Sequence, residues 1–315
     1  MNFGKTIRIY LADGTPTGIR HAEVVNWTGQ AIICPRGRVG ELAQWLESQR
    51  PGVYVLFGED ESGSKEKAYI GEAENVLTRL QSHLKNKDFW DRVVFFTSKD
   101  ENLTKAHVKY LEARMVELTL QAGRVVLENG TAPQLPSLPR ADRDAMEEFL
   151  DPARILLAAL GSLILHPLPK KPQGGGPAAG GKSGPLSDVR LHLNVSKTGV
   201  VAEGVSTDEG FVVYSGSIGP LRVLDSLSKG WRDLREELIS QKSIVPDMDK
   251  KIITFVQDVL FKSPSAAAAV VCGGVRNGRD AWRDEQGTPL KQLEENLAAS
   301  EGEPAFISDK DPEDE

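Results

Sequence analysis

Two short apolar runs in the first half of the sequence each contain a tyrosine, Tyr54 in "GVYVLF" and Tyr69 in "KAYIG". Behind the second run, Arg79 and His83 lie four residues apart and therefore on one face of a helix. In the simplest interpretation the tyrosines are core residues and the two basic side chains are solvated. In a second interpretation all four side chains converge on one phosphate, which an arginine binds through charge-assisted hydrogen bonds.

Glu112 is a candidate ligand of a hard cation. It lies on the flank of the apolar stripe of a long helix in "TKAHVKYLEARMVELTLQAG". A carboxylate at the edge of a core is partly desolvated, which is costly unless a cation satisfies it. Mg²⁺ would do so with one or two protein carboxylates plus water and phosphate. The alternative is an ion pair with Lys105, Lys109 or Arg114.

In combination these residues resemble the GIY-YIG nucleases, a resemblance that covers about 80 residues. "GVY" and "YIG" resemble the two halves of the signature that names the family. Arg79 stands ten residues after the second tyrosine, as it does in that family. Two departures are Val53 in place of isoleucine and a longer, acidic hairpin loop. The family's ordered set corresponds here to Tyr54, Tyr69, Arg79, His83, Glu112 and Asn129.

The resemblance implies hydrolysis of a phosphodiester with one divalent metal ion, Mg²⁺ or Mn²⁺. By this analogy Glu112 holds the metal, and Arg79 pairs with the scissile phosphate. A tyrosine, Tyr54 or Tyr69, orients or deprotonates the attacking water, and His83 assists as a hydrogen-bond partner or proton relay. The analogy also gives Asn129, otherwise a turn residue before a glycine, the role of bracing the site. Gly52 and Gly71 are expected to permit close backbone approach.

The elements that position these residues follow in the order strand, strand, helix, strand, helix, which predicts a compact α/β (α+β) domain. The resemblance implies that its sheet is small and three-stranded, with flanking helices. Before it, "KTIRIYLADGTPTG" is typical of strands and turns. A Pro- and Gly-rich stretch after it is typical of a flexible linker. The predicted organisation is a β module (1–47), the nuclease-like domain (48–135), a helical extension (136–166), a linker (167–186), a separate α+β domain (187–292) and an acidic disordered tail (293–315).

The second half of the chain resembles a domain of unknown function often found behind such nucleases. It is also similar to a module attached to restriction-modification proteins and proposed to read DNA. Four residues have a structural interpretation as helix cap, turn and core aromatic: Ser263, Asn277, Gly278 and Trp282. Three arginines next to the turn are candidates for phosphate contact: Arg276, Arg279 and Arg283.

Composition sets limits on partners and location. The net charge of -7 argues against a generally basic nucleic-acid coat protein, so binding would depend on local basic surfaces. One is expected around Arg79, Lys85, Lys87 and Lys109. Two distant cysteines offer neither a disulfide framework nor zinc spacing, which favours a reducing cytoplasm. No signal peptide is visible, and no apolar run is long enough for a membrane span.

The sequence therefore predicts a divalent-metal-dependent DNA endonuclease with a C-terminal substrate-recognition module. The alternative is a non-catalytic DNA-binding or adaptor protein built on the same scaffold. An RNA target, the oligomeric state and the choice among restriction, repair and defence against mobile DNA remain open at this stage.

Overall fold

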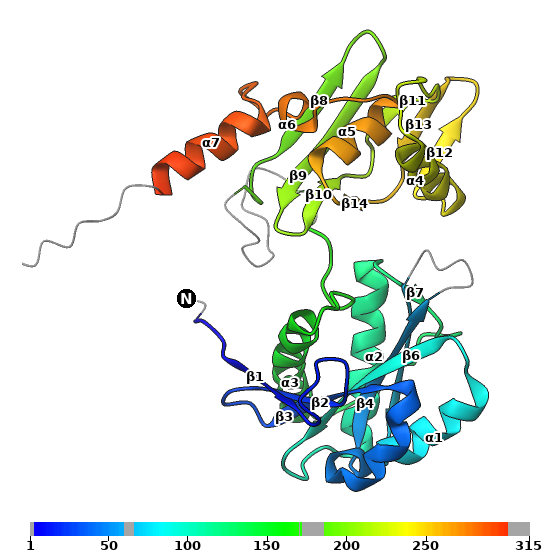
Figure 1. Ribbon diagram of the computed structural model, residues 1–315, viewed down its shortest axis with the longest axis vertical. Helices are drawn as coiled ribbons and strands as arrows, with labels where there is room; N and C mark the ends of the chain where they lie inside the picture. Colours follow the sequence, from blue (N-terminus) through cyan, green and yellow to red (C-terminus); the bar gives the residue numbers. More distant parts are fainter. Residues whose placement is uncertain (1–2, 60–65, 170, 172–185, 302–315) are drawn as a thin grey trace, which may run out of the picture. The chain divides into compact units, whose positions relative to one another are not determined.

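The computed structural model describes residues 3–59, 66–169, 171 and 186–301. The chain divides into two compact units, Met1–Pro167 and Leu168–Glu315 (Figure 1). No helix among the described residues combines the length and the apolar character that a membrane span requires. Three stretches of the expected organisation fall outside the described residues: most of the acidic hairpin loop (60–65), most of the linker (170 and 172–185) and the end of the acidic tail (302–315).

The first unit is built on one seven-stranded sheet in the order β1-β2-β3-β6-β4-β5-β7. All neighbouring strands are antiparallel except β5 and β7, which are parallel. The strands are β1 (Ile7–Leu11), β2 (Arg20–Val24), β3 (Gly29–Pro35), β4 (Gly52–Glu59), β5 (Glu66–Ala73), β6 (Trp90–Ser98) and β7 (Val126–Leu127).

The expectation of a separate N-terminal β module beside a three-stranded sheet is corrected by the pairing of β3 with β6. This ladder runs from Gly29 opposite Ser98 to Pro35 opposite Arg92. Residues 29–34 of β3 are all buried, as in a central strand with both faces covered. The N-terminal strands therefore extend the same sheet and share its core.

Helices cover both faces of this sheet (Figure 1). On one face, Tyr54 and Leu56 of β4 pack with Val76 and Leu80 of α1. The other face packs against α2 and α3, so the segment expected as a helical extension contributes to the main core. The helices are α1 (Val76–Asn86), α2 (Lys105–Ala122) and α3 (Arg140–Ala159), with two 3₁₀ segments, η1 (Arg36–Gln44) and η2 (Leu46–Gln49), packed on the α1 side.

The second unit is a mixed α+β domain. Its sheet has the order β12-β13-β11-β9-β10-β14, and β8 also pairs with β9. Its strands are β8 (Leu191–Val195), β9 (Val200–Thr207), β10 (Gly210–Val213), β11 (Ile218–Pro220), β12 (Ile244–Asp247), β13 (Ile252–Phe255) and β14 (Val259–Phe261). Its helices are α4 (Lys229–Ser240), α5 (Pro264–Cys272), α6 (Gly278–Ala281) and α7 (Leu290–Glu301).

The Ala-rich helix α5 is the centre of the second core, with residues 266–272 all buried. The Ser263 side chain caps it by accepting a hydrogen bond from the Ala266 amide at 3.1 Å. Asn277 caps the short helix α6, and the Gly278 amide donates to the Ser265 hydroxyl at 3.1 Å. Trp282 is fully buried and donates from Nε1 to the Pro264 carbonyl at 3.0 Å.

The stretch expected as an acidic disordered tail begins instead as a helix. Residues 293–301 belong to α7, and Leu290 at its start is buried in the second core. Arg279 of α6 forms an ion pair with Glu294 of α7. The expectation of disorder rested on the acidic residues of this stretch, whereas the buried Leu290 anchors the start of the helix to the second core.

Because β3 is an internal strand, Ile33→Ala is expected to lower the free energy of unfolding of the first unit by about 2–5 kcal/mol. Ile33 is 2% exposed and pairs with Val94, whereas Ile9 on the edge strand β1 is 47% exposed. The matched control Ile9→Ala is expected to change the free energy of unfolding by less than about 0.5 kcal/mol. Denaturant unfolding of the two variants measures the difference, and equal losses would contradict an integral β3.

Candidate active site

The β4–β5 hairpin places Tyr54 and Tyr69 on the α1 side of the sheet. Tyr54 lies opposite Gly71, and Tyr69 lies opposite Leu56. Tyr54 is fully buried, whereas Tyr69 is half-buried. The two ring centroids are 6.3 Å apart. The register of the hairpin, combined with strand alternation, therefore brings both tyrosines to one face.

Two glycines make room for this arrangement. A Cβ on Gly71 would lie 2.3 Å from the Tyr54 hydroxyl oxygen, so only glycine lets the phenol cross the β5 backbone. A Cβ on Gly52 would lie 2.5 Å from the Phe96 carbonyl oxygen of the neighbouring strand. Both positions require close approach, and neither has a left-handed backbone conformation.

Helix α1 presents Arg79 and His83 to the same face. Asn75 caps the helix by accepting from the Thr78 amide at 2.9 Å, and the apolar stripe fixes its rotation. His83 is only 5% exposed and lies under the tyrosines rather than on the outer helix surface. Its Nε2 is 2.7 Å from the Tyr54 hydroxyl, and the Arg79 Nε–H donates to that hydroxyl at 3.3 Å.

Arginine has only donors, so the Tyr54 oxygen accepts from Arg79. The direction of the hydrogen bond between the Tyr54 hydroxyl and His83 Nε2 depends on which ring nitrogen of His83 carries the proton. Burial, with the charges of Arg79 and Lys87, lowers the pKa of His83 to about 4, so the ring is neutral at pH 7. Burial also raises the pKa of Tyr54 well above its usual value, although the hydrogen bond from Arg79 opposes this.

Glu112 approaches from the opposite side of the sheet, on α2. Burial, reinforced by the charge of Glu72, raises its pKa to about 7 against the opposing charges of Arg79 and Lys109. Among the described residues Glu112 has no hydrogen bond and no ion pair from its side chain. Of the cations that could have paired with it, Lys105 binds Glu74 at 2.7 Å and Arg114 binds Glu147 at 2.6 Å. The ion-pair alternative is thus not realised.

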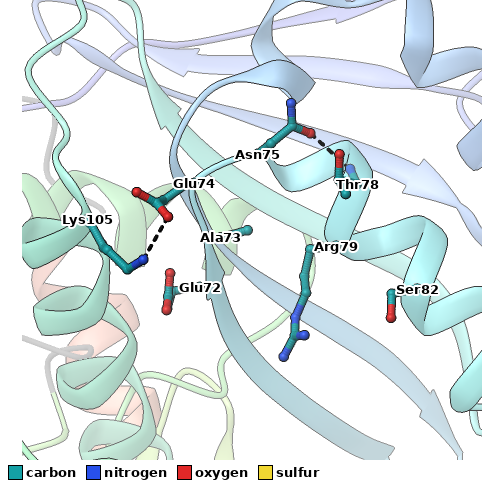
Figure 2. Close-up of a pocket in the computed structure, with 8 residues that line it drawn as sticks. All are labelled: Glu72, Ala73, Glu74, Asn75, Thr78, Arg79, Ser82 and Lys105. Atoms are coloured by element: carbon teal, nitrogen blue, oxygen red, sulfur yellow. Dashed lines mark hydrogen bonds and ion pairs between the residues drawn. The ribbon is translucent and has the colours of Figure 1, made fainter.

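Two hollows open beside these residues. The first has a volume of about 450 Å³ and is lined by Arg79, Glu72, Glu74 and Lys105, among others. Figure 2 shows Arg79 and Glu72 projecting from α1 and β5 into this space, while Glu74 turns to Lys105. The second hollow, of about 560 Å³, is lined by Glu112, Lys109 and residues 133–137.

The Asn129 side chain hydrogen-bonds to the β5 backbone. Its side-chain amide accepts from the Ile70 N–H at 3.0 Å and donates to the Ile70 carbonyl at 2.8 Å. These two bonds continue, by means of a side chain, the parallel pairing that β7 makes with Lys67 and Ala68. Asn129 is therefore a positioning residue that braces the strand carrying Tyr69 and Gly71.

Glu72 is the residue that sequence reasoning missed. Strand alternation puts it on the same face of β5 as Ala68 and Ile70, which belong to the core formed with α2. A carboxylate that continues an apolar face at the end of a strand was the available signal. The described residues contain no group of three or more His, Cys, Asp or Glu side chains arranged to hold a metal ion. A divalent ion here would thus be held by the carboxylate oxygens of Glu112, with Glu72 nearby, plus water and phosphate; hard oxygen donors of this kind fit Mg²⁺ or Mn²⁺.

The basic residues expected to contact nucleic acid differ in how they are engaged. Lys85 and Lys109 are exposed, and the Lys87 ammonium lies 4.1 Å from the centroid of the Tyr69 ring. In the second unit Arg276 is exposed. Arg279 is paired with Glu294, and Arg283 donates to the Gly287 carbonyl at 2.8 Å. Two of the three arginines expected to bind phosphate therefore already have protein partners.

Comparison with known proteins bears on the second unit. Residues 191–294 match the model of a family described as "Domain of unknown function (DUF4357)". This agrees with the resemblance of the second half to a domain of unknown function. Searches among curated proteins and solved structures return no match. The family match does not extend to the first unit, whose interpretation depends on its own residues and geometry.

Gly71→Ala is expected to destabilise the first unit by about 1–3 kcal/mol, because the new methyl group must displace the buried Tyr54 ring. Gly130→Ala is the matched control, since a Cβ there meets nothing within 4 Å. Denaturant unfolding compares the two variants. A Gly71→Ala protein as stable as the control would show that the Tyr54 position is not fixed by this contact.

The raised pKa of Glu112 predicts a pH dependence of stability in chelator-treated protein. Its folded pKa of about 7 exceeds the ordinary value of 4.5, so the folded state holds a proton that the unfolded state has released. This contribution is complete below about 4.5 and is lost as the pH rises through about 7. His83 has the opposite sign: its stabilising effect is present above 6.5 and is lost as the pH falls through about 4.

Comparison of wild type with Glu112→Gln separates the two effects. The variant is expected to gain stability relative to wild type as the pH rises from about 4.5 to about 7. Allowing for partial exposure, the gain is on the order of 2 kcal/mol. Denaturant midpoints across this range measure it. A stability difference that does not vary with pH would contradict the raised pKa.

Proposed function

We propose that the first unit is a divalent-metal-dependent endonuclease of the GIY-YIG type that hydrolyses phosphodiester bonds in DNA. One observation carries this proposal. At one end of β5, α1 contributes an arginine, α1 and β4 a bonded histidine–tyrosine pair, and α2 a half-buried carboxylate that has no partner among the described residues. This combination has the parts needed to bind a phosphate, transfer a proton and hold a hard cation.

Arg79 is the phosphate-binding group in this proposal. Its Nε donates to Tyr54, and its terminal nitrogens extend into the first hollow (Figure 2). A phosphodiester there receives charge-assisted hydrogen bonds that strengthen as negative charge develops on its oxygens. Glu112 is the metal-binding group. Mg²⁺ or Mn²⁺ bound there supplies Lewis-acid stabilisation of the phosphate and lowers the pKa of bound water.

Tyr54 and His83 form the proton-transfer pair. A water proton passes to the Tyr54 oxygen as the Tyr54 proton passes to His83 Nε2, so the charge that remains is an imidazolium. The low pKa of His83 opposes this step in the free protein. A phosphate that neutralises Arg79 removes one cause of the lowered pKa, so substrate binding itself makes His83 a better acceptor. Tyr69, half-buried beside them, orients the water.

The second unit is assigned a supporting role in selecting the nucleic acid. The assignment draws on the resemblance of this half to a module proposed to read DNA and on the exposed Arg276. The proposed phosphate contacts of the second unit are fewer than the sequence predicts, because Arg279 and Arg283 would have to give up Glu294 and the Gly287 carbonyl to bind phosphates. A non-catalytic adaptor on the same scaffold is the alternative function. Such a protein could use Arg79 to bind phosphate, but it would have no use for an unpaired, half-buried Glu112.

The test is cleavage of plasmid and branched DNA, and of RNA, with Mg²⁺ or Mn²⁺ and with chelator. Wild type is expected to cut DNA only with metal. Glu112→Gln is expected to abolish cleavage while leaving most DNA binding intact, because a neutral amide does not neutralise a dication. Glu117→Gln, on the exposed side of the same helix, is the matched control and should cut normally.

Arg79→Lys is expected to lower the single-turnover rate about 100-fold or more, since a point charge does not replace a planar guanidinium. Its DNA affinity should fall much less. Loss of rate only in proportion to loss of affinity would reduce Arg79 to a binding residue. A Glu112→Gln protein that cuts at the wild-type rate, or cleavage that continues in chelator, would overturn the metal-dependent mechanism. Binding without cleavage by wild type would favour the adaptor.

A further inference from the structure

Glu72 and Glu74 lie two residues apart where β5 meets α1, and both line the first hollow. Their environments differ. The Glu74 carboxylate is exposed and pairs with Lys105 at 2.7 Å. The Glu72 carboxylate is half-buried, and the described residues give it neither an ion pair nor a hydrogen bond. Within the part of the chain that the structure describes, the exposed carboxylate of the two is thus paired and the more buried one is not.

Glu72 lies on the face of β5 that packs against α2, the helix that carries Glu112. Alternation along β5 places Glu72 on the face that Ala68 and Ile70 share with α2. Leu111, which immediately precedes Glu112, packs in the same core. The charge of Glu72 is also the strongest single charge acting on the pKa of Glu112. Both carboxylates therefore belong to the α2 side of the sheet, where Glu72 lines the first hollow with Arg79 and Glu112 lines the second.

We propose that Glu72 supplies a second carboxylate to the divalent ion held by Glu112. This inference rests on the proposed nuclease function and adds a ligand to it. Two carboxylates neutralise a divalent cation, and the phosphodiester neutralises Arg79, so the loaded site is close to electroneutral. With Glu112 as the only carboxylate, the same site carries excess positive charge in a partly desolvated place, which is costly. Mg²⁺ sites with one or two protein carboxylates completed by water and phosphate are the usual kind.

In the metal-free protein the same pair is unfavourable, because like charges repel where water is partly excluded. Glu72→Gln therefore has two opposite effects. It relieves repulsion in the metal-free protein and weakens binding of the ion. A carboxylate that was only a tolerated surface charge would show neither effect, and Glu74 provides that comparison on the same strand.

The test is Mn²⁺ binding by the full-length protein without DNA, followed by the loss of the free-ion electron paramagnetic resonance signal. Wild type is expected to bind one ion saturably, and Glu112→Gln to lose that binding. Glu72→Gln is expected to raise the dissociation constant about tenfold or more. Glu74→Gln, the matched control, is expected to stay within about twofold of wild type, because an exposed ion pair contributes little. Thermal unfolding in chelator should place the midpoint of Glu72→Gln at or above that of wild type.

Two results would overturn the inference in distinguishable ways. Glu72→Gln with wild-type affinity, while Glu112→Gln has lost the ion, would remove Glu72 from the site and leave the nuclease proposal standing. Wild type without saturable Mn²⁺ binding, or Glu112→Gln that retains it, would contradict the metal role of Glu112 and this inference together. A lowered midpoint of Glu72→Gln in chelator would show that Glu72 stabilises the fold instead.

Discussion

The end of strand β5, where the outer edge has no neighbouring strand among the described residues, is the constraint on which the candidate site depends. A sheet keeps side chains from its two faces apart, and Arg79 and Glu112 come from helices on opposite faces. They can act on one substrate only around an uncovered strand edge. The short strand β7 pairs with Lys67 and Ala68, and Asn129 then holds Ile70. The outer edge of the strand is thus braced up to Ile70 and has no paired strand among the described residues at Gly71 and Glu72, where the proposed phosphate-binding and metal-binding groups would meet.

The buried pair of Tyr54 and His83 lies beside this edge and is hydrogen-bonded to Arg79 through the Tyr54 hydroxyl. The phenol oxygen accepts from Arg79 and also forms a hydrogen bond with the neutral imidazole of His83. In the proposed mechanism this arrangement would link phosphate binding to proton transfer, because the Arg79 guanidinium is also one of the charges that lower the pKa of His83. The pKa of Glu112 is shifted in the opposite direction. In the free protein, burial and the charge of Glu72 favour its protonated form, and a bound cation would favour the carboxylate instead.

The helical and strand spacing of residues close in sequence predicted several contacts of this site. The features that were not predicted depend on pairing between residues far apart in sequence. Strand alternation and helical spacing are short-range signals, and they brought Tyr54, Arg79 and His83 into contact as the spacing implied. The pairing of β3 with β6 has no local signal, so the sheet grew from the expected three strands to seven. The hydrogen bond between Asn129 and Ile70 spans 59 residues of sequence. From the residues around it alone, Asn129 has the pattern of a turn residue. Glu72 was passed over because a family motif directs attention to matching positions, whereas its environment depends on a helix that begins more than thirty residues later.

A crystal structure with Mn²⁺ and a DNA strand carrying a non-hydrolysable phosphate linkage tests the central claim most directly. Anomalous scattering locates the ion independently of the surrounding model. The account predicts an anomalous peak between the Glu112 and Glu72 carboxylates, with a phosphate bound by the terminal nitrogens of Arg79 and the Tyr54 hydroxyl still bonded to His83. An ion bound elsewhere, or DNA that avoids the end of β5, would contradict it.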